Sequence, residues 1–201
     1  GSVLEIDPAS GDVSTYFTFP EGSGQPNDLA LRTDGTLYVS FFNDGLWKVA
    51  PNGARGQKAG EGFHNGIDLS PDQTRLYSEK KTYDVAEDGS LANPRPLLQV
   101  PPREDGFSYT DGIRVDAAGN IYMARFGGNE IAGDRQSPRL GGVVHQFNPD
   151  GQLIRNIPLP SPDVTNLSFG GPEGRTVFVT LPGQQGSIVS FKSEYAGREF
   201  R

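Results

Sequence analysis

One sequence motif, which we call the hairpin phrase, occurs four times in this chain, and it constrains the fold more than any other feature. Each copy begins with an Asn or Asp, continues as an apolar strand, turns at polar residues with Gly or Pro, and returns as a second strand. Apolar and polar residues alternate with a period of two, which is typical of a half-buried β-strand. The four copies are residues 27–40, 65–78, 111–124 and 166–180. The chain is therefore organised around four related β-hairpins.

The spacing of these hairpins predicts the architecture. Successive copies start 38, 46 and 55 residues apart, at positions 27, 65, 111 and 166, and further short strands fill the intervals. No stretch has a helical period. Four-stranded units that recur about every 40–50 residues are typical of propeller blades. A β-sandwich is the alternative, but it does not explain why each unit restarts with the same phrase. We expect one all-β propeller domain over residues 1–201, with a surface loop at 129–140.

Composition excludes several classes of function. The formal net charge is −7, which argues against nucleic acid or an anionic membrane as a partner. No window of 18 apolar residues is present, so we expect no membrane span. Cysteine is absent, which excludes disulfides and thiolate metal sites. We expect a soluble protein, and the sequence leaves open whether it is cytoplasmic or exported after removal of a signal.

The first residue of each repeat is a candidate for a shared site. In a propeller the innermost strand of each blade lines the central channel, so Asn27, Asn65, Asp111 and Asn166 should converge on one mouth. Carboxylate and amide oxygens are the ligands that Ca²⁺, Mg²⁺ and Mn²⁺ prefer. The alternative is that each side chain caps its own turn. Recurrence of the same register in four copies favours the shared site.

These residues resemble a known family. The resemblance is to the SMP-30/gluconolactonase/regucalcin-like proteins, and it rests on four phrases in a fixed order: Pro26-Asn27-Asp28-Leu29, His64-Asn65-Gly66-Ile67, Thr110-Asp111-Gly112-Ile113 and Thr165-Asn166. It implies a six-bladed β-propeller with a central divalent cation, usually Ca²⁺, and metal ligands at Asn27, Asn65 and Asp111. The length of this chain suits four to five blades.

Two departures from the family pattern affect the expected site. The family supplies a fourth ligand from a Glu-Gly-Pro phrase, whereas here Glu21-Gly22 lies six residues before Asn27. Lactonases of the family often carry an Arg two residues before position 27, and this chain has Gln25 there. We expect Gln25, His64 and Asn166 to contact substrate. For His64, the alternative is a loop histidine with no catalytic role.

The resemblance implies a divalent-metal-dependent hydrolase of a small lactone or related ester, with Asp111 as metal ligand and catalytic residue. Ca²⁺ is the expected cofactor, and Mg²⁺, Mn²⁺ or Zn²⁺ are alternatives. Two other functions stay open: an organophosphate hydrolase of the same family, and a non-catalytic propeller that binds a ligand or protein. If the ring is incomplete, we expect either a homodimer through the end blades or closure by strands 3–6 and 13–19 beside residues 188–191.

Overall fold

The strands form four antiparallel sheets and one separate hairpin. The computed structural model describes residues 1–62, 64–78, 81–100, 110–127, 141–182 and 185–200. Blade A contains β3 (Pro26–Leu31), β4 (Leu37–Phe41), β5 (Gly45–Val49) and β6 (Gly56–Gly60). Blade B contains β7 (Ile67–Leu69), β8 (Arg75–Ser78), β9 (Lys81–Val85) and β10 (Leu91–Pro96). Blade C contains β11 (Thr110–Val115), β12 (Ile121–Arg125), β13 (Val143–Phe147) and β14 (Leu153–Pro158), and blade D contains β15 (Asn166–Gly170), β16 (Thr176–Leu181) and β17 (Ser187–Lys192).

The remaining elements are short. An N-terminal hairpin pairs β1 (Ser2–Ile6) with β2 (Val13–Thr18). In the described part of the chain the only helices are two 3₁₀ turns, η1 (Pro51–Gly53) and η2 (Arg198–Phe200), and no helix is long and apolar enough to cross a bilayer. The all-β class is therefore confirmed. The predicted loop at 129–140 lies outside the described residues.

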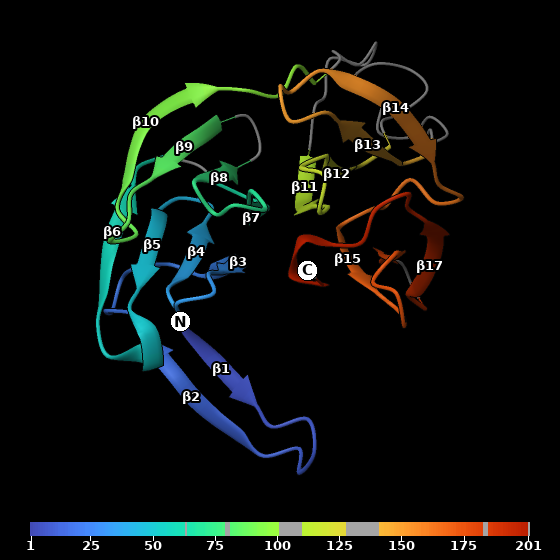
Figure 1. Cartoon of the computed structure of the whole chain (residues 1–201). Coiled ribbons are helices and arrows are strands. Elements are labelled where there is room, and N and C mark those ends of the chain that lie inside the picture. The colour runs from blue at the N-terminus through green and yellow to red at the C-terminus, as the bar shows by residue number, and fades with distance from the viewer. Residues whose placement is uncertain (63, 79–80, 101–109, 128–140, 183–184, 201) are drawn as a thin grey trace.

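The four blades stand side by side around a common centre, as in a propeller (Figure 1). The first strand of each blade is innermost, and neighbouring inner strands are in contact: β3 with β7, β7 with β11, and β11 with β15. The ring is open between blade D and the N-terminal hairpin. The predicted propeller architecture is therefore confirmed, with four blades placed in order along the sequence.

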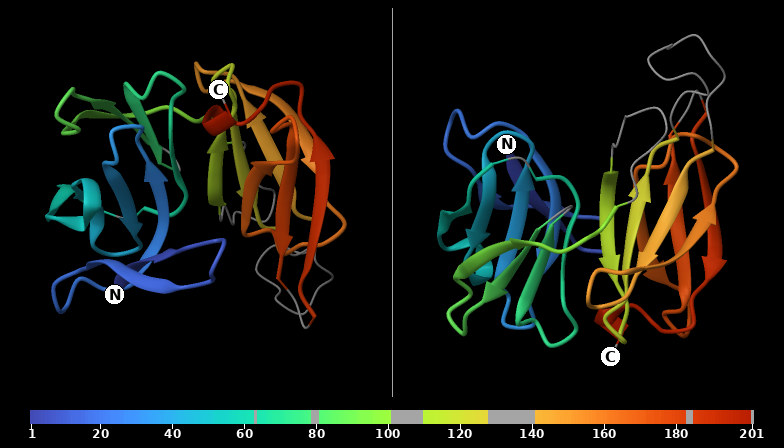
Figure 2. Two further views of the ribbon diagram at one scale, coloured as in Figure 1. Left: turned by 60° about the horizontal axis from the view of Figure 1, so that its bottom comes forward. Right: turned by 90° about the horizontal axis from the view of Figure 1, so that it is seen from above.

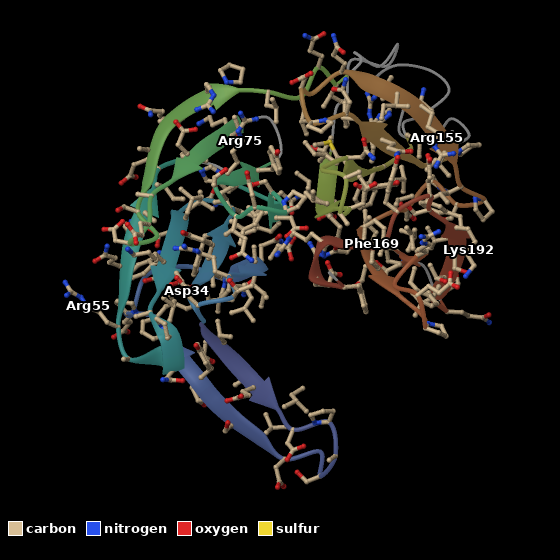
Figure 3. All side chains as sticks on the ribbon, in the orientation of Figure 1. Asp34, Arg55, Arg75, Arg155, Phe169 and Lys192 are labelled. Atoms are coloured by element: carbon tan, nitrogen blue, oxygen red, sulfur yellow. The ribbon has the colours of Figure 1, made fainter. Side chains whose placement is uncertain are left out.

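Apolar side chains fill the spaces between neighbouring blades (Figure 3). Between blades A and B the buried cluster includes Tyr38, Leu46, Ile67 and Leu76. Between blades C and D, the Tyr122 ring meets the Phe169 ring edge to face, with centroids 5.3 Å apart. Strands of the inner hairpins are buried on both faces where they lie between two sheets, and every residue of β4, β7 and β12 is buried. These interfaces form the core, and they fix the order of the inner strands.

The N-terminal hairpin packs on blade A and does not close the ring. Its chain continues into Phe19, whose ring lies 4.9 Å from that of Phe41 and 5.4 Å from that of Trp47. Among the described strands, β1 and β2 pair only with each other, and β17 pairs only with β16. The predicted closure beside residues 188–191 is therefore wrong, because these aromatic contacts hold the hairpin against blade A.

The two ends of the ring expose apolar side chains. Leu31 on β3 of blade A is 52% exposed and Ile188 on β17 of blade D is 68% exposed, although the N-terminal hairpin covers part of blade A. Pairing of these ends with a second copy of the chain stays a prediction, which sedimentation velocity tests.

The C-terminal segment links blade D to blades A and B at the turn end of the inner hairpins (Figure 2). The Arg198 guanidinium lies 2.6 Å from Asp68 Oδ1 and also reaches the Leu31 carbonyl at 3.5 Å. The amide of Ala117 donates to the Ala196 carbonyl at 2.8 Å. Both side chains of the Arg198–Asp68 pair are largely buried, with 12% and 4% exposed. The segment therefore connects the last blade to the first across the open ring.

We predict that Arg198→Ala destabilises the protein, because it leaves the buried Asp68 carboxylate without its cation. Removing one partner of a buried pair costs about 3–5 kcal/mol, measured as the free energy of unfolding in urea. The control is Arg95→Ala, which breaks the exposed Arg95–Asp84 pair on the outer strands of blade B. Equal stability losses in the two variants would contradict this role of Arg198.

Candidate metal and substrate site

The four repeat-starting residues lie near the starts of the inner strands: Asn27 and Asp111 at register shifts within β3 and β11, Asn65 two residues before β7, and Asn166 at the first residue of β15. Each lies four residues before the last paired residue of its inner hairpin: 27 and 31, 65 and 69, 111 and 115, 166 and 170. Since the inner strands are neighbours in the ring, this register puts the four residues at one end of the channel. The metal site expected from the sequence depends on this arrangement of the four residues.

Asn65 is the most tightly held of the four. Its side chain is fully buried, and its Nδ2 donates to the Thr110 carbonyl at 2.9 Å. The Ser40 hydroxyl donates to the Asn65 carbonyl at 2.6 Å. Asn65 Oδ1, in contrast, is buried and has no hydrogen-bond partner among the described residues. A buried acceptor without a partner is costly, so this oxygen is a candidate to bind a water molecule or another ligand.

Asp111 and Asn166 lie on the two neighbouring inner strands, which approach closely. A Cβ at Gly66 would lie 2.4 Å from the Asp111 carbonyl oxygen, and a Cβ at Gly112 would lie 2.1 Å from Asn166 Oδ1. Gly66 and Gly112 therefore allow the chain segments around the starts of β7, β11 and β15 to approach one another closely. Asp111 and Asn166 are both half-buried, and Asn166 Oδ1 accepts from the Leu167 amide at 2.8 Å.

Asn27 and Gln25 are exposed at the entrance to blade A. Gln25 lines a cavity of about 290 Å³ whose other walls include Phe41, Asn43 and Asp44. Asn27 is tied to the rest of the site through its neighbour Asp28, whose amide donates to Ser40 Oγ at 3.1 Å. The structure thus brings Asn65, Asp111 and Asn166 together on adjacent strands, and it leaves Asn27 and Gln25 on the accessible side.

His64 lies in the core, and both of its ring nitrogens have protein partners. Nδ1 is 2.6 Å from Ser78 Oγ, and Nε2 is 3.0 Å from the Glu61 carbonyl and 3.3 Å from the Tyr83 hydroxyl. With Nε2–H donating to Glu61, Nδ1 accepts from Ser78, so the neutral imidazole is satisfied. Burial lowers the pKa of His64 below its usual 6.5. Contact of His64 with substrate stays a prediction.

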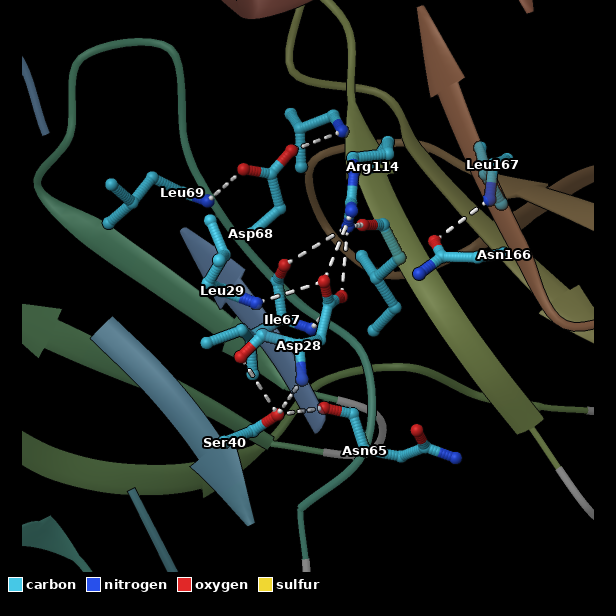
Figure 4. Close-up of polar contacts among 12 residues, drawn as sticks. Asp28, Leu29, Ser40, Asn65, Ile67, Asp68, Leu69, Arg114, Asn166 and Leu167 are labelled. Atoms are coloured by element: carbon cyan, nitrogen blue, oxygen red, sulfur yellow. Dashed lines mark hydrogen bonds and ion pairs between the residues drawn. The ribbon is translucent and has the colours of Figure 1, made fainter. Parts of the chain in front are cut away.

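Sequence reasoning missed a buried network directly behind these residues (Figure 4). Asp28 on β3 and Arg114 on β11 form a two-point ion pair, with Nη1–Oδ2 2.9 Å and Nη2–Oδ1 3.1 Å. The Ile67 amide on β7, the strand between them, donates to Asp28 Oδ2 at 3.1 Å. The available sequence signal was weak: a polar residue in the middle of each otherwise apolar inner strand.

The donor set fits a hard cation better than a transition metal. Across the described ranges, no group of three or more His, Cys, Asp or Glu side chains could hold a metal ion. A cation at this mouth would therefore depend on the amide oxygens of Asn27 and Asn65 together with the Asp111 carboxylate. The unpartnered Asn65 Oδ1 is consistent with such a ligand set, because Ca²⁺ and Mg²⁺ bind neutral amide oxygens and carboxylates.

Comparison with known proteins agrees with this fold. The model of the SMP-30/gluconolactonase/LRE-like region matches residues 1–182. The chain belongs to this family, and the resemblance found in the sequence is confirmed. Its inner-strand Asn and Asp residues lie within the matched region.

Two curated relatives are lactonases by name. The pentonolactonase XacC of Haloferax volcanii is 29% identical over 175 residues, which cover 84% of this chain and 49% of that protein. The gluconolactonase of Zymomonas mobilis is 24% identical over 210 residues, which cover 89% of this chain and 54% of that protein. The chain thus spans about half the length of these relatives.

Solved structures of the family share the fold. A calcium-binding protein, regucalcin from Agrobacterium tumefaciens, superposes with a TM-score of 0.74 at 19% identity, over 97% of this chain and 70% of that one. A gluconolactonase from Xanthomonas campestris gives a TM-score of 0.71 at 20% identity, over 96% of this chain and 65% of that one. At this level of identity the likeness establishes the propeller fold alone.

We predict that the buried His64 makes stability depend on pH. Its pKa is lower in the folded protein than in the unfolded chain, so protonation favours unfolding. Its contribution is fully present above about pH 7 and is lost as the pH falls below 6.5, by up to about 1.4 kcal/mol per pH unit. The measurement is urea unfolding at pH 7.5 and 5.5. His64→Gln should show a smaller pH dependence than the parent protein, and an identical dependence would contradict the burial of a neutral His64.

Proposed function

We propose that this chain belongs to a divalent-metal-dependent hydrolase that opens a small lactone or related ester, and that it carries the end of the central channel where metal and substrate bind. The observation that carries the proposal is Asn65 Oδ1, which is buried, has no partner among the described residues, and belongs to a side chain bonded to Thr110, the residue before Asp111. Membership of the family supports the reaction class, and the lactonase names of the relatives support the substrate class.

The cation site is assigned to Asn27, Asn65 and Asp111, with Ca²⁺ as the first candidate and Mg²⁺, Mn²⁺ or Zn²⁺ as alternatives. A divalent cation there would supply Lewis-acid polarisation of the substrate carbonyl and charge stabilisation for the developing oxyanion. The Asp111 carboxylate is the one charged group among the four mouth positions. Cation binding would hold it ionised and limit its basicity, so its proposed roles as ligand and general base compete.

Three other residues are assigned to substrate. Gln25 lines the 290 Å³ cavity on the accessible side of the mouth, where its amide could hydrogen-bond a polar substrate. Asn166 lies against Gly112 on the opposite side. His64 is assigned with them, and because its ring is in the core it would act through its neighbour Asn65 or after a local rearrangement.

The first test measures the cation through stability. Only one formal charge is present among the three assigned ligands, so the dissociation constant of Ca²⁺ should be on the order of 10⁻⁴–10⁻³ M. A ligand at a tenfold excess over its dissociation constant stabilises the folded state by about 1.4 kcal/mol. Millimolar Ca²⁺ should therefore raise the melting temperature by a few degrees in a saturable way, EDTA should reverse the rise, and Asp111→Ala should abolish it. NaCl at matched ionic strength is the control for screening of the net charge. Identical melting curves in CaCl₂ and NaCl would remove the metal site.

The second test measures turnover on a panel of sugar lactones, aryl esters and phosphotriesters, with Ca²⁺ supplied. We expect lactone hydrolysis, and we expect Asp111→Asn to lower kcat/KM by about 100-fold or more. Asp150→Asn is the matched control, because Asp150 lies in the exposed turn between β13 and β14. Full activity of Asp111→Asn would exclude its catalytic role. Turnover of phosphotriesters alone would favour the organophosphate hydrolase.

A non-catalytic platform is the second candidate function. It is favoured by the exposed apolar side chains at both ends of the ring, including Leu31 and Ile188, and by the presence of Gln25 where family lactonases often carry Arg. A propeller can serve as a rigid binding surface, and the fold alone does not decide function. Saturable Ca²⁺ binding without turnover of any substrate in the panel would select this function.

A further inference from the structure

We propose that the buried Asp28–Arg114 ion pair, coupled to Asn65 through Ser40, is a positioning device that sets the spacing of the mouth oxygens and thereby the affinity for the cation. The inference rests on the proposed metal site. It assigns a role to three residues that touch neither the cation nor the substrate in that proposal.

The ion pair joins inner strands that are far apart in sequence. Both Arg114 terminal nitrogens meet both Asp28 carboxylate oxygens, at 2.9 and 3.1 Å, so the contact fixes orientation as well as distance. The exposed fractions of the two side chains are 20% and 6%. Because Asp28 also accepts from the Ile67 amide at 3.1 Å, one carboxylate holds β3, β7 and β11 together.

A second set of contacts carries this spacing to the mouth. Ser40 Oγ accepts from the Asp28 amide at 3.1 Å and donates to the Asn65 carbonyl at 2.6 Å. Asn65 Nδ2 in turn donates to the carbonyl of Thr110, the residue before Asp111. This series of hydrogen bonds includes Asn65 itself. It also includes Asp28 and Thr110, the residues next to Asn27 and Asp111 in the sequence. A change in the separation of β3 and β11 must shift the backbone at all three.

When Arg114 is replaced, the loss of its charge and the change in strand spacing should alter the affinity for the cation in opposite directions, which makes the inference testable. Removing the Arg114 cation leaves the Asp28 carboxylate without its ion-pair partner, while Asp68 keeps its pair with Arg198. By Coulomb attraction alone, that change should tighten the binding of a cation at the mouth. Loss of the two-point contact should loosen the mouth and weaken binding. The sign of the change in affinity therefore separates the two effects.

The experiment is calorimetric titration of Ca²⁺ into the full chain and its variants. Arg114→Lys keeps the charge but loses the planar two-point contact, and Arg114→Gln also removes the charge. We expect the dissociation constant to rise about tenfold or more in both variants. Arg95→Gln is the control, because Arg95 makes an exposed two-residue ion pair with Asp84 on the outer strands, and it should bind Ca²⁺ like the parent protein. Unchanged or tighter binding by Arg114→Gln would overturn the inference.

If the Arg114 variants do not fold, a second pair of variants, which changes no charge, provides the test. Ser40→Ala removes the hydroxyl between Asp28 and Asn65 without changing charge, and it should raise the dissociation constant about threefold or more. Thr82→Val is its control, because Thr82 is also a buried hydroxyl but donates to the Leu76 carbonyl within blade B. Equal affinities of these two variants would overturn the inference.

A readout without metal separates this inference from the proposed function. In ¹⁵N-labelled protein free of Ca²⁺, we expect the Asn65 side-chain amide and the Asp111 backbone amide to shift in Arg114→Lys and to stay in place in Arg95→Gln. If the parent protein binds no divalent cation, the proposed metal site fails, and these shifts still test the positioning role. Unchanged Asn65 and Asp111 signals in Arg114→Lys would refute that role.

Discussion

The burial of apolar strand faces between neighbouring blades is the interaction on which the rest of the structure depends. Each inner strand is short, three residues long in β7, and it is stable because its side chains pack between two sheets. Ile67 and Ile113 lie at equivalent paired positions and are completely buried. A one-residue slip would turn these side chains away from the interfaces, so the packing fixes the register. That register brings Asn27, Asn65, Asp111 and Asn166 to one end of the channel.

Polar groups at the centre of the ring then set the finer geometry. The carboxylates of Asp28 and Asp68 are buried, and each is paired with an Arg from a distant part of the chain. Such pairs contribute little net stability because both ions lose water, but breaking one of them is costly. The Arg114 pair lies between the inner strands, and the Arg198 pair holds the C-terminal segment across their turn end. The centre of the ring thus restricts relative movement of blades A, B and C, and among the described residues it leaves Asn65 Oδ1 without a partner.

The sequence predicted the repeated elements and failed where distant segments meet. The hairpin phrase correctly gave the inner two strands of every blade, because alternation and turn residues are local signals. Strand β6 was missed, since Gly56-Gln57-Lys58-Ala59-Gly60 has no apolar alternation and forms the outer edge of blade A. The Asp28–Arg114 pair joins residues 86 apart, and nothing local to either residue indicates its partner. The wrong expectation for the N-terminal strands has the same origin: aromatic contacts of Phe19, not strand pairing, decide where the hairpin packs. The starts of the inner hairpins were predictable, and the burial of His64 was not; the convergence of the four residues on one site stays a prediction.

The account's central claim is that the inner-strand register creates a cation site of amide and carboxylate oxygens at the mouth of the propeller. A crystal structure of the protein grown with Ca²⁺ tests this claim most directly. The account predicts one ion at the mouth, about 2.3–2.6 Å from Asn65 Oδ1 and from an Asp111 carboxylate oxygen. A structure with no ion there at millimolar Ca²⁺, and with Asn65 Oδ1 hydrogen-bonded to a protein group, would contradict it.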